Sequence, residues 1–146
     1  PLLIWRPDLK GTLCDSLNKR CVYLEKACEL IGVKSEIIHA RSEELGRKKR
    51  ECFDFATARA VAAMPMLSEF CIPFVKVGGK FIALKSINED ISTASGAIAK
   101  LGGEIETVTD YAIPNGDARR LAVIKKISQT PTKYPRNSGN IAKKPL

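Results

Sequence analysis

The chain has 146 residues, of which 45% are hydrophobic and 27% charged, and its net charge is +8. This composition is ordinary for one globular domain, and no apolar run approaches the roughly 18 residues that a membrane-spanning helix needs. The five cysteines contain no C-x-x-C pair and His39 is the only histidine, so a zinc site or a disulfide framework lacks its expected spacing.

The first part of the chain predicts three strands and one helix. Residues 11–15 form a short apolar segment that ends in Asp15, which is typical of a buried strand. Further strands are expected at residues 35–39 and 53–58, separated by a polar loop whose basic run, residues 47–50, is solvated. Between the first two strands, apolar residues recur at steps of three and four and predict a helix that ends at Gly32: Leu17, Cys21, Leu24, Cys28 and Ile31.

The middle of the chain predicts two helices around one strand. A helix is expected over residues 65–74, with Pro65 in its first turn. A Gly-Gly turn then leads into a strand at residues 80–84. Ser86 and Glu89 have the spacing of a capping box, so we expect the second helix to begin there.

The last part of the chain predicts two consecutive strands, near residues 105–113 and 120–126. Strands that alternate with helices and then follow each other directly indicate an α/β open sheet finished by a β-hairpin. We therefore expect a domain over residues 1–127 and an irregular tail at residues 128–146, which has three prolines and no acidic residue. We also expect a cytoplasmic protein with reduced thiols and with neither a metal nor a membrane as partner.

Asp15 is the residue that first suggests a ligand. In doubly wound sheets, an acidic residue that ends the second strand of a nucleotide-binding half binds ribose hydroxyls, about 20 residues after a glycine-rich turn. Only Gly11 precedes Asp15, so we expect that turn and its strand to lie before Pro1 and the chain to be an N-terminally truncated piece. Asp15 would equally serve to cap the helix that follows it, and both roles can hold together.

The positive charge is concentrated at the C-terminal end. Residues 1–116 hold 16 basic and 15 acidic side chains, whereas residues 117–146 hold 8 basic side chains and 1 acidic one. This asymmetry is typical of a phosphate-binding surface, and a solvated basic tail is the alternative. The chain has no P-loop sequence and no nucleophile in a recognisable setting beside its one histidine, so P-loop phosphoryl transfer and triad hydrolysis are not supported.

Five segments in a fixed order carry a resemblance to a known family. The segments read DSLNKR at 15–20, ARSEEL at 40–45, FDFATARAVA at 53–62, GGKFIALK at 78–85 and KYPR at 133–136. With these segments the chain resembles the bacterial small-subunit rRNA guanine-N7 methyltransferase G family, also called glucose-inhibited division protein B, over nearly its whole length. The resemblance implies a Rossmann-like methyltransferase sheet that here lacks its first strand and its N-terminal helices.

The resemblance also implies a reaction: methylation of N7 of a guanosine in the decoding region of 16S rRNA, with S-adenosylmethionine as the cofactor and 16S rRNA or the small ribosomal subunit as the partner. It implies that the truncated chain alone is inactive. By position it assigns cofactor-binding roles to Asp15, Ser16, Ser42, Glu43 and Arg59, a catalytic role to Arg59, and RNA-binding roles to Arg41, Lys85, Arg119, Tyr134 and Arg136.

Two other interpretations stay open at this point. The chain would also suit a non-catalytic RNA-binding module that has kept the sheet and the tail of a methyltransferase. It would also suit a methyltransferase that acts on a small molecule or a protein. Binding that is insensitive to salt favours the latter over RNA, because phosphate contacts release counterions.

Overall fold

The computed structural model describes residues 1–146, and the chain divides into two compact units, residues 1–42 and residues 43–146. Residues 128–146, expected to form a separate tail, belong to the same unit as residues 43–127. None of the helices combines the length and the apolar character that crossing a membrane requires.

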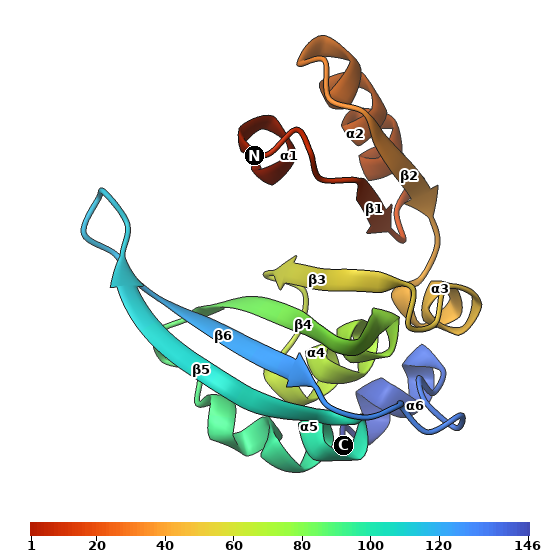
Figure 1. The fold of residues 1–146 in the computed structure, drawn as a ribbon, viewed down its shortest axis with the longest axis vertical. Helices are drawn as coiled ribbons and strands as arrows, with labels where there is room; N and C mark the ends of the chain where they lie inside the picture. Colours follow the sequence, from red (N-terminus) through yellow and green to blue (C-terminus); the bar gives the residue numbers. More distant parts are fainter. The chain divides into compact units, whose positions relative to one another are not determined.

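Unit 1, residues 1–42, is built around a β-α-β arrangement (Figure 1). Its elements are α1 (Leu2–Trp5), β1 (Gly11–Asp15), α2 (Asn18–Leu30) and β2 (Ser35–His39). The two strands pair in parallel, with Asp15 opposite His39. Cys21 is the buried residue of α2, and Gly32 ends the helical segment with a φ of 67°, as its position after the apolar stripe predicts.

Unit 2, residues 43–146, contains a four-stranded sheet in the order β3-β4-β6-β5. The pair β3 and β4 is parallel, and β6 joins β4 and β5 in antiparallel pairing. The expected α/β fold with a sheet finished by a hairpin is therefore confirmed, but the strands expected at residues 11–15 and 35–39 of that sheet pair with each other in a separate two-stranded sheet. The elements are α3 (Ser42–Lys48), β3 (Phe53–Arg59), α4 (Met64–Cys71), β4 (Val75–Ser86), α5 (Ser95–Lys100), β5 (Gly103–Ala112), β6 (Ala118–Lys126) and α6 (Ser138–Lys143), with short 3₁₀ turns η1 (Ile72–Phe74) and η2 (Ile91–Ala94).

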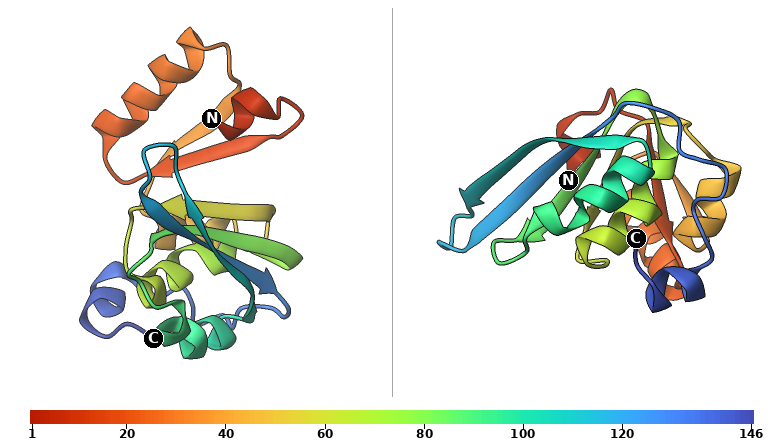
Figure 2. Two further views of the ribbon diagram at one scale, coloured as in Figure 1. Left: turned by 90° about the vertical axis from the view of Figure 1, so that its left-hand side faces the viewer. Right: turned by 90° about the horizontal axis from the view of Figure 1, so that it is seen from below.

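Helices α4 and α5 cover one face of this sheet, while the β5–β6 hairpin extends beyond them (Figures 1 and 2). The core lies between these helices and β4 and β6. Its fully buried side chains include Met64, Leu67, Phe81, Ile98 and Ile124, which removes a continuous apolar surface from water.

Two expected boundaries in unit 2 are wrong. The helix expected to reach Phe74 ends at Cys71 and continues as the 3₁₀ turn η1, because Pro73 has no N–H to donate to a longer helix. The strand expected to start at Lys80 begins at Val75 instead. The pairing of β3 with β4 shifts its register between Phe53 and Phe55, and Gly78 accommodates this irregularity with a φ of 90°.

The expected capping box is also wrong. Ser86 is the last residue of β4, and the side chain of Asp90 caps the following 3₁₀ turn by accepting a hydrogen bond from the Ser92 amide. The Glu89 carboxylate accepts instead from the amide of Met64, the first residue of α4. The sequence spacing fitted a local cap, but Glu89 caps a helix that is distant in the chain.

The basic run at residues 47–50 is not simply solvated. Arg47 and Lys48 lie at the end of α3 rather than in a loop, and both arginines of the run bind the main chain of the C-terminal segment, residues 128–146. Arg47 donates to the Pro135 carbonyl at 3.2 Å, and Arg50 donates to the carbonyls of Tyr134 and Pro131 at 2.6 and 2.9 Å and also to that of Thr130. These bonds dock a segment that contains the helix α6, so the C-terminal segment is neither free nor wholly irregular.

Arg136 completes this docking through an ion pair with Glu69 of α4. Its Nε and Nη2 lie 2.9 and 2.6 Å from the two carboxylate oxygens, and its backbone amide donates to Glu69 Oε1 at 2.7 Å. The Glu69 side chain is completely buried. Removal of Arg136 would therefore leave a buried carboxylate without its cation.

We predict that Arg136→Ala lowers the free energy of unfolding of the full-length protein by about 3 kcal/mol, because it strands the buried Glu69 charge. Urea denaturation measures this change. Lys133→Ala is the matched control: its ammonium lies over the Tyr134 ring at 5.3 Å in an exposed position, so we expect a loss of about 1 kcal/mol or less. Equal effects of the two substitutions would contradict the ion-pair account.

Candidate functional site

Asp15 ends β1, where its carboxylate is held by two local donors. Oδ1 accepts from the Leu17 amide at 2.8 Å, and Oδ2 lies 3.3 Å from Nη1 of Arg20. The Leu17 hydrogen bond is the main cause of a lowered pKa for Asp15, with the Arg20 hydrogen bond and charge as further causes. The group is thus an ionised acceptor at neutral pH, and each oxygen has lone-pair capacity left for a further donor.

Asp15 therefore supports the turn before α2 and also keeps capacity for a ligand. Leu17, rather than Asp15, occupies the N-cap position of α2. The neighbouring Ser16 presents its carbonyl to Nε2 of His39 at 3.1 Å, which ties the end of β1 to the end of β2. The carboxyl ends of two parallel strands meet at this edge of unit 1, the edge at which ligands bind in such sheets.

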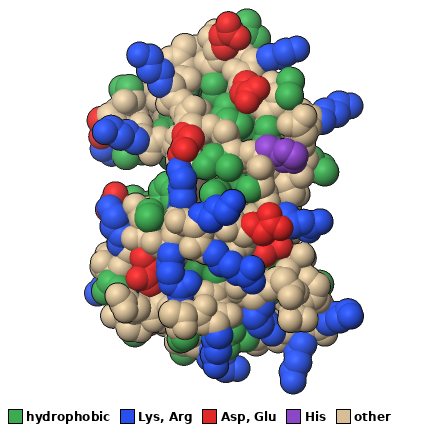
Figure 3. Space-filling view, turned by 90° about the vertical axis from the view of Figure 1, so that its right-hand side faces the viewer, with side chains coloured by type: hydrophobic (Ala, Val, Ile, Leu, Met, Phe, Trp, Pro, Cys, Tyr) green, Lys and Arg blue, Asp and Glu red, His purple; other side chains and the backbone are tan.

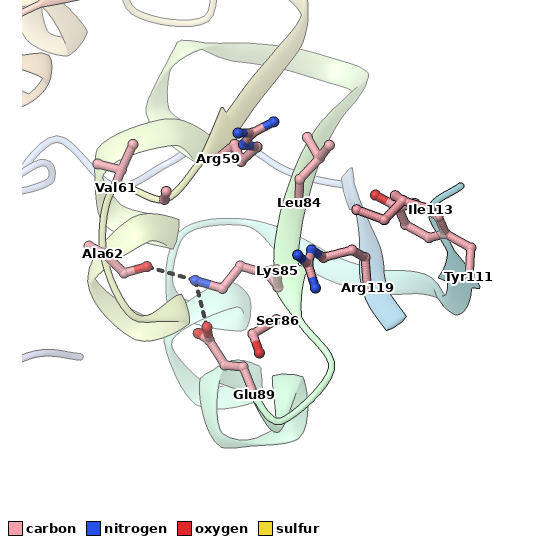
Figure 4. Close-up of a pocket in the computed structure, with 11 residues that line it drawn as sticks. Arg59, Val61, Ala62, Leu84, Lys85, Ser86, Glu89, Tyr111, Ile113 and Arg119 are labelled. Atoms are coloured by element: carbon pink, nitrogen blue, oxygen red, sulfur yellow. Dashed lines mark hydrogen bonds and ion pairs between the residues drawn. The ribbon is translucent and has the colours of Figure 1, made fainter. Parts of the chain in front are cut away.

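Unit 2 holds a pocket of about 720 Å³ at the carboxyl ends of β3 and β4 (Figure 4). One wall comes from the segment that follows β3, the floor from the end of β4 and Glu89, and the other wall from the β5–β6 hairpin. Its volume lies within the usual range of ligand pockets. It is lined by Arg59, Ala60, Val61, Ala62, Leu84, Lys85, Ser86, Glu89, Tyr111, Ile113 and Arg119.

Arg59 is the basic residue of this pocket whose side chain has no bonding partner. Arg59 is exposed at the end of β3, and its side chain takes part in none of the hydrogen bonds or ion pairs of the structure. Ala60, the next residue, has a φ of 55°, in the left-handed region that residues with a Cβ seldom adopt. The chain therefore leaves β3 through a sharp turn directly after Arg59.

The Lys85 side chain, in contrast, is bound by other groups of the protein at the floor of the pocket. Its Nζ donates to the Ala62 carbonyl at 2.7 Å and pairs with Glu89 Oε2 at 2.8 Å (Figure 4). Only 6% of the Lys85 side chain is exposed. These contacts give Lys85 a role inside the fold, and the geometry does not support the expected contact with RNA.

Arg119 lines the hairpin side of the pocket, and Arg120 follows it in β6. Arg119 is partly exposed and pairs with Asp117 at 2.8 Å, close to the hairpin turn. Arg120 binds both oxygens of Asp110 at 2.7 and 2.8 Å, and this pairing lowers the pKa of Asp110. Tyr111 lies directly opposite Arg119 across the two strands and adds an aromatic ring to the pocket wall.

The remaining predicted residues fall in several places. Arg41 is exposed at the end of unit 1, and Ser42 is half-buried as the first residue of α3. Glu43, the next residue of α3, is buried.

Tyr134 is also buried, 8% exposed, so its ring is not available for stacking on a base. Arg136 is held by Glu69 and is likewise not available as an RNA contact.

The predicted residues thus form two groups. Asp15 and Ser16 lie at the strand ends of unit 1, and Arg59 and Arg119 line the pocket of unit 2. Sequence reasoning missed Glu89 and Tyr111 as pocket residues. Lys85 and Glu89 are four residues apart, and this spacing was a usable signal for an ion pair. Glu89 was instead interpreted as part of a capping box.

Comparison with known proteins decides the family. Residues 1–120 match the family described as rRNA small subunit methyltransferase G. The chain belongs to the rRNA small subunit methyltransferase G family. A member from Clostridium perfringens, strain 13, is 47% identical over the whole chain, which covers 64% of that relative's length. The chain thus spans about two thirds of the length of the curated relatives that it matches.

Solved structures agree on the fold. The 16S rRNA (adenine(1408)-N(1))-methyltransferase of Catenulisporales acidiphilia, as a W203A mutant, matches 92% of this chain with a TM-score of 0.71 and 10% identity, over 79% of its own chain. TYW2 of M. jannaschii, solved in complex with AdoMet, matches 81% of this chain with a TM-score of 0.62 and 12% identity, over 58% of its own chain. This member of the methyltransferase G family therefore has the Rossmann-like α/β fold of S-adenosylmethionine-dependent methyltransferases.

We predict that the Asp15 carboxyl titrates below the ordinary aspartate range, measured by NMR in the full-length protein. The hydrogen bond from the Leu17 amide is the main cause, so Arg20→Ala raises the midpoint but leaves it below the ordinary value. Because the folded-state pKa is lowered, Asp15 contributes stability at neutral pH that is lost as the pH falls through that pKa. A midpoint at the ordinary aspartate value in the unchanged protein would contradict this account.

Proposed function

We propose that the chain is the part of a methyltransferase that transfers a methyl group from S-adenosylmethionine to N7 of a guanosine in the decoding region of 16S rRNA. The observation that carries the proposal is the pocket at the carboxyl ends of β3 and β4, in a chain of the methyltransferase G family. This pocket is lined by Arg59, whose side chain has no bonding partner within the protein. With 16S rRNA or the small ribosomal subunit as substrate, the protein would work in the cytoplasm.

The residues of unit 1 fit the cofactor. Asp15 is an ionised acceptor at a strand end, so it suits the two hydroxyls of a ribose. Ser16 follows it, and Ser42, the last residue of unit 1, is the proposed contact of the adenine; Glu43, which the resemblance also assigns to the cofactor, belongs to unit 2 and is buried. S-adenosylmethionine, when bound, supplies an electrophilic methyl group on a sulfonium.

The residues of unit 2 fit a guanine. Guanine N7 has an in-plane lone pair and carries no proton, so no side chain has to remove a proton before methyl transfer. What the protein must supply is orientation and a suitable electrostatic environment. Arg59 would donate to guanine O6, an acceptor next to N7, and would leave N7 itself free to react. The carboxylate that lines the pocket, Glu89, is already bound by Lys85 and by the Met64 amide, in agreement with a reaction that needs no base.

The phosphates of the RNA would contact basic side chains that remain exposed. Arg119 lines the pocket, and Lys133, Lys143 and Lys144 are exposed on the docked C-terminal segment. Figure 3 shows Lys and Arg side chains spread over one face of unit 2. The hydrogen bond from Arg47 to the Pro135 carbonyl docks the C-terminal segment against α3.

We predict that the full-length protein, given S-adenosylmethionine and 16S rRNA or small ribosomal subunits, forms 7-methylguanosine in the RNA. Mass spectrometry of the digested nucleosides detects the product. Arg59→Ala lowers kcat/KM by about 100-fold or more, since it removes a preorganised donor. Arg6→Ala is the control, because Arg6 is exposed and pairs only with Asp8, and we expect its rate within about twofold of the unchanged protein.

The other possible results of this experiment would each contradict a different part of the proposal. RNA that is bound but never methylated would contradict the proposal and favour the non-catalytic RNA-binding module. A normal rate in Arg59→Ala would remove Arg59 from the site. Methylation of a protein or small molecule but not of RNA would replace the proposed substrate.

A further inference from the structure

Glu89 is the residue at which the separate walls of the pocket are joined. Its Oε1 accepts from the Met64 amide at 2.7 Å, and its Oε2 pairs with Lys85 Nζ at 2.8 Å. Its backbone carbonyl accepts from Arg120 Nη1 at 2.9 Å. One residue thus connects the segment after β3, the end of β4 and the β5–β6 hairpin.

The backbone of Glu89 is anchored on the hairpin side. Arg120 is held in place by the bidentate pair with Asp110, and from there it reaches the Glu89 carbonyl. Lys85 and Arg120 lie directly opposite each other across β4 and β6, where two like charges repel. Glu89 relieves this repulsion, since its carboxylate binds one cation and its carbonyl binds the other.

The side chain of Glu89 acts on the opposite wall. Its carboxylate holds the amide of Met64, and its partner Lys85 holds the carbonyl of Ala62 at 2.7 Å. The short segment between Arg59 and α4 is therefore fastened at two points. Ala60 adopts a left-handed conformation in this segment, which persists only where surrounding contacts impose it.

We propose that Glu89 is a positioning residue of the methyl-transfer site: through Lys85 and the Met64 amide it fixes the turn at Ala60 and so the direction of Arg59. The inference rests on the proposed function and deepens it. Glu89 does not itself contact the base in this account. The ion pair between the buried Lys85 and the partly exposed Glu89 holds the segment that follows Arg59, and the exposed Arg59 lines the pocket.

Glu89→Gln in the full-length protein tests the proposal. The amide oxygen of glutamine still accepts from Met64, but the neutral side chain no longer pairs with the buried Lys85. We expect kcat/KM for 16S rRNA to fall roughly 10- to 100-fold, which is the effect of a small misplacement of a catalytic group. Circular dichroism at the assay temperature establishes that the variant is folded.

Glu106→Gln is the matched control. Glu106 forms an ion pair of 2.7 Å with Lys80 on the same sheet but does not line the pocket. We expect its rate to stay within about twofold of the unchanged protein, as for other surface substitutions. A loss of rate equal to that of Glu89→Gln would overturn the proposal, because the effect would then not be specific to Glu89.

A double-substitution cycle distinguishes positioning from a general structural role. If Glu89 acts through Arg59, then adding Glu89→Gln to Arg59→Lys slows the reaction by no more than about twofold beyond Arg59→Lys alone. A merely structural defect would multiply the two losses, and that result would overturn the proposal. Lys85→Met combined with Glu89→Gln removes both charges of the ion pair, and we expect this variant to fold and to remain slow.

Hydrogen exchange provides a readout that does not depend on activity. We expect the amides of residues 60–64 to exchange faster in Glu89→Gln than in Glu106→Gln. If the unchanged protein does not methylate rRNA but this difference in exchange is seen, the proposed function fails while the fastening by Glu89 stands. If rRNA is methylated and neither exchange nor rate responds to Glu89→Gln, the positioning role is wrong.

Discussion

The parallel pairing of β3 with β4 is the constraint from which the pocket follows. Because parallel strands end at the same edge of a sheet, this pairing brings Arg59 and Lys85 to one place although 25 residues separate them. The strand β6 then adds to β4 in the antiparallel sense and places Arg119 opposite Ser86. Three strands thereby deliver basic side chains to a single cleft, and any shift in their register would separate these side chains.

Burial decides which of these cations stay available to a ligand. A buried cation must have anionic or carbonyl partners, and the fold provides them for Lys85 and Lys126, while the partly buried Arg136 is held by the buried Glu69. Burial lowers the pKa of Lys126, which is held by the Leu101 carbonyl, Thr130 and Glu51. The net charge therefore overstates the basic surface that RNA can reach. Arg59 and Arg119 keep exposed guanidinium surface, which is why the proposed chemistry is assigned to the pocket and not to the buried pairs.

Local patterns were enough to predict most of the fold. The strand that ends at Asp15, the stripe that predicts α2, and the two consecutive strands that form the hairpin all depend on residues close to each other in the chain. The Ser86 and Glu89 spacing failed because the carboxylate found a donor 25 residues away, at Met64, which no local rule contains.

The site was predicted less completely than the fold, for a related reason. Arg50 was interpreted as solvated because its carbonyl partners lie more than 80 residues later in the chain. Lys85 and Arg136 were assigned to RNA because their charge is visible in the sequence, whereas their ion pairs with Glu89 and with the buried Glu69 appear only in the tertiary structure. Asp15 was placed correctly at a strand end, since an acid after a short apolar run is a local signal.

The most direct test of the account is a crosslink from the pocket to the RNA. Val61 is 63% exposed on the pocket wall, two residues after Arg59, so a photoreactive amino acid at this position faces whatever the pocket binds. In the full-length protein on small ribosomal subunits, we expect the crosslink at or next to the methylated guanosine of the decoding region. Crosslinks confined to other regions of the rRNA, with methylation intact, would contradict the assignment of this pocket to the target base.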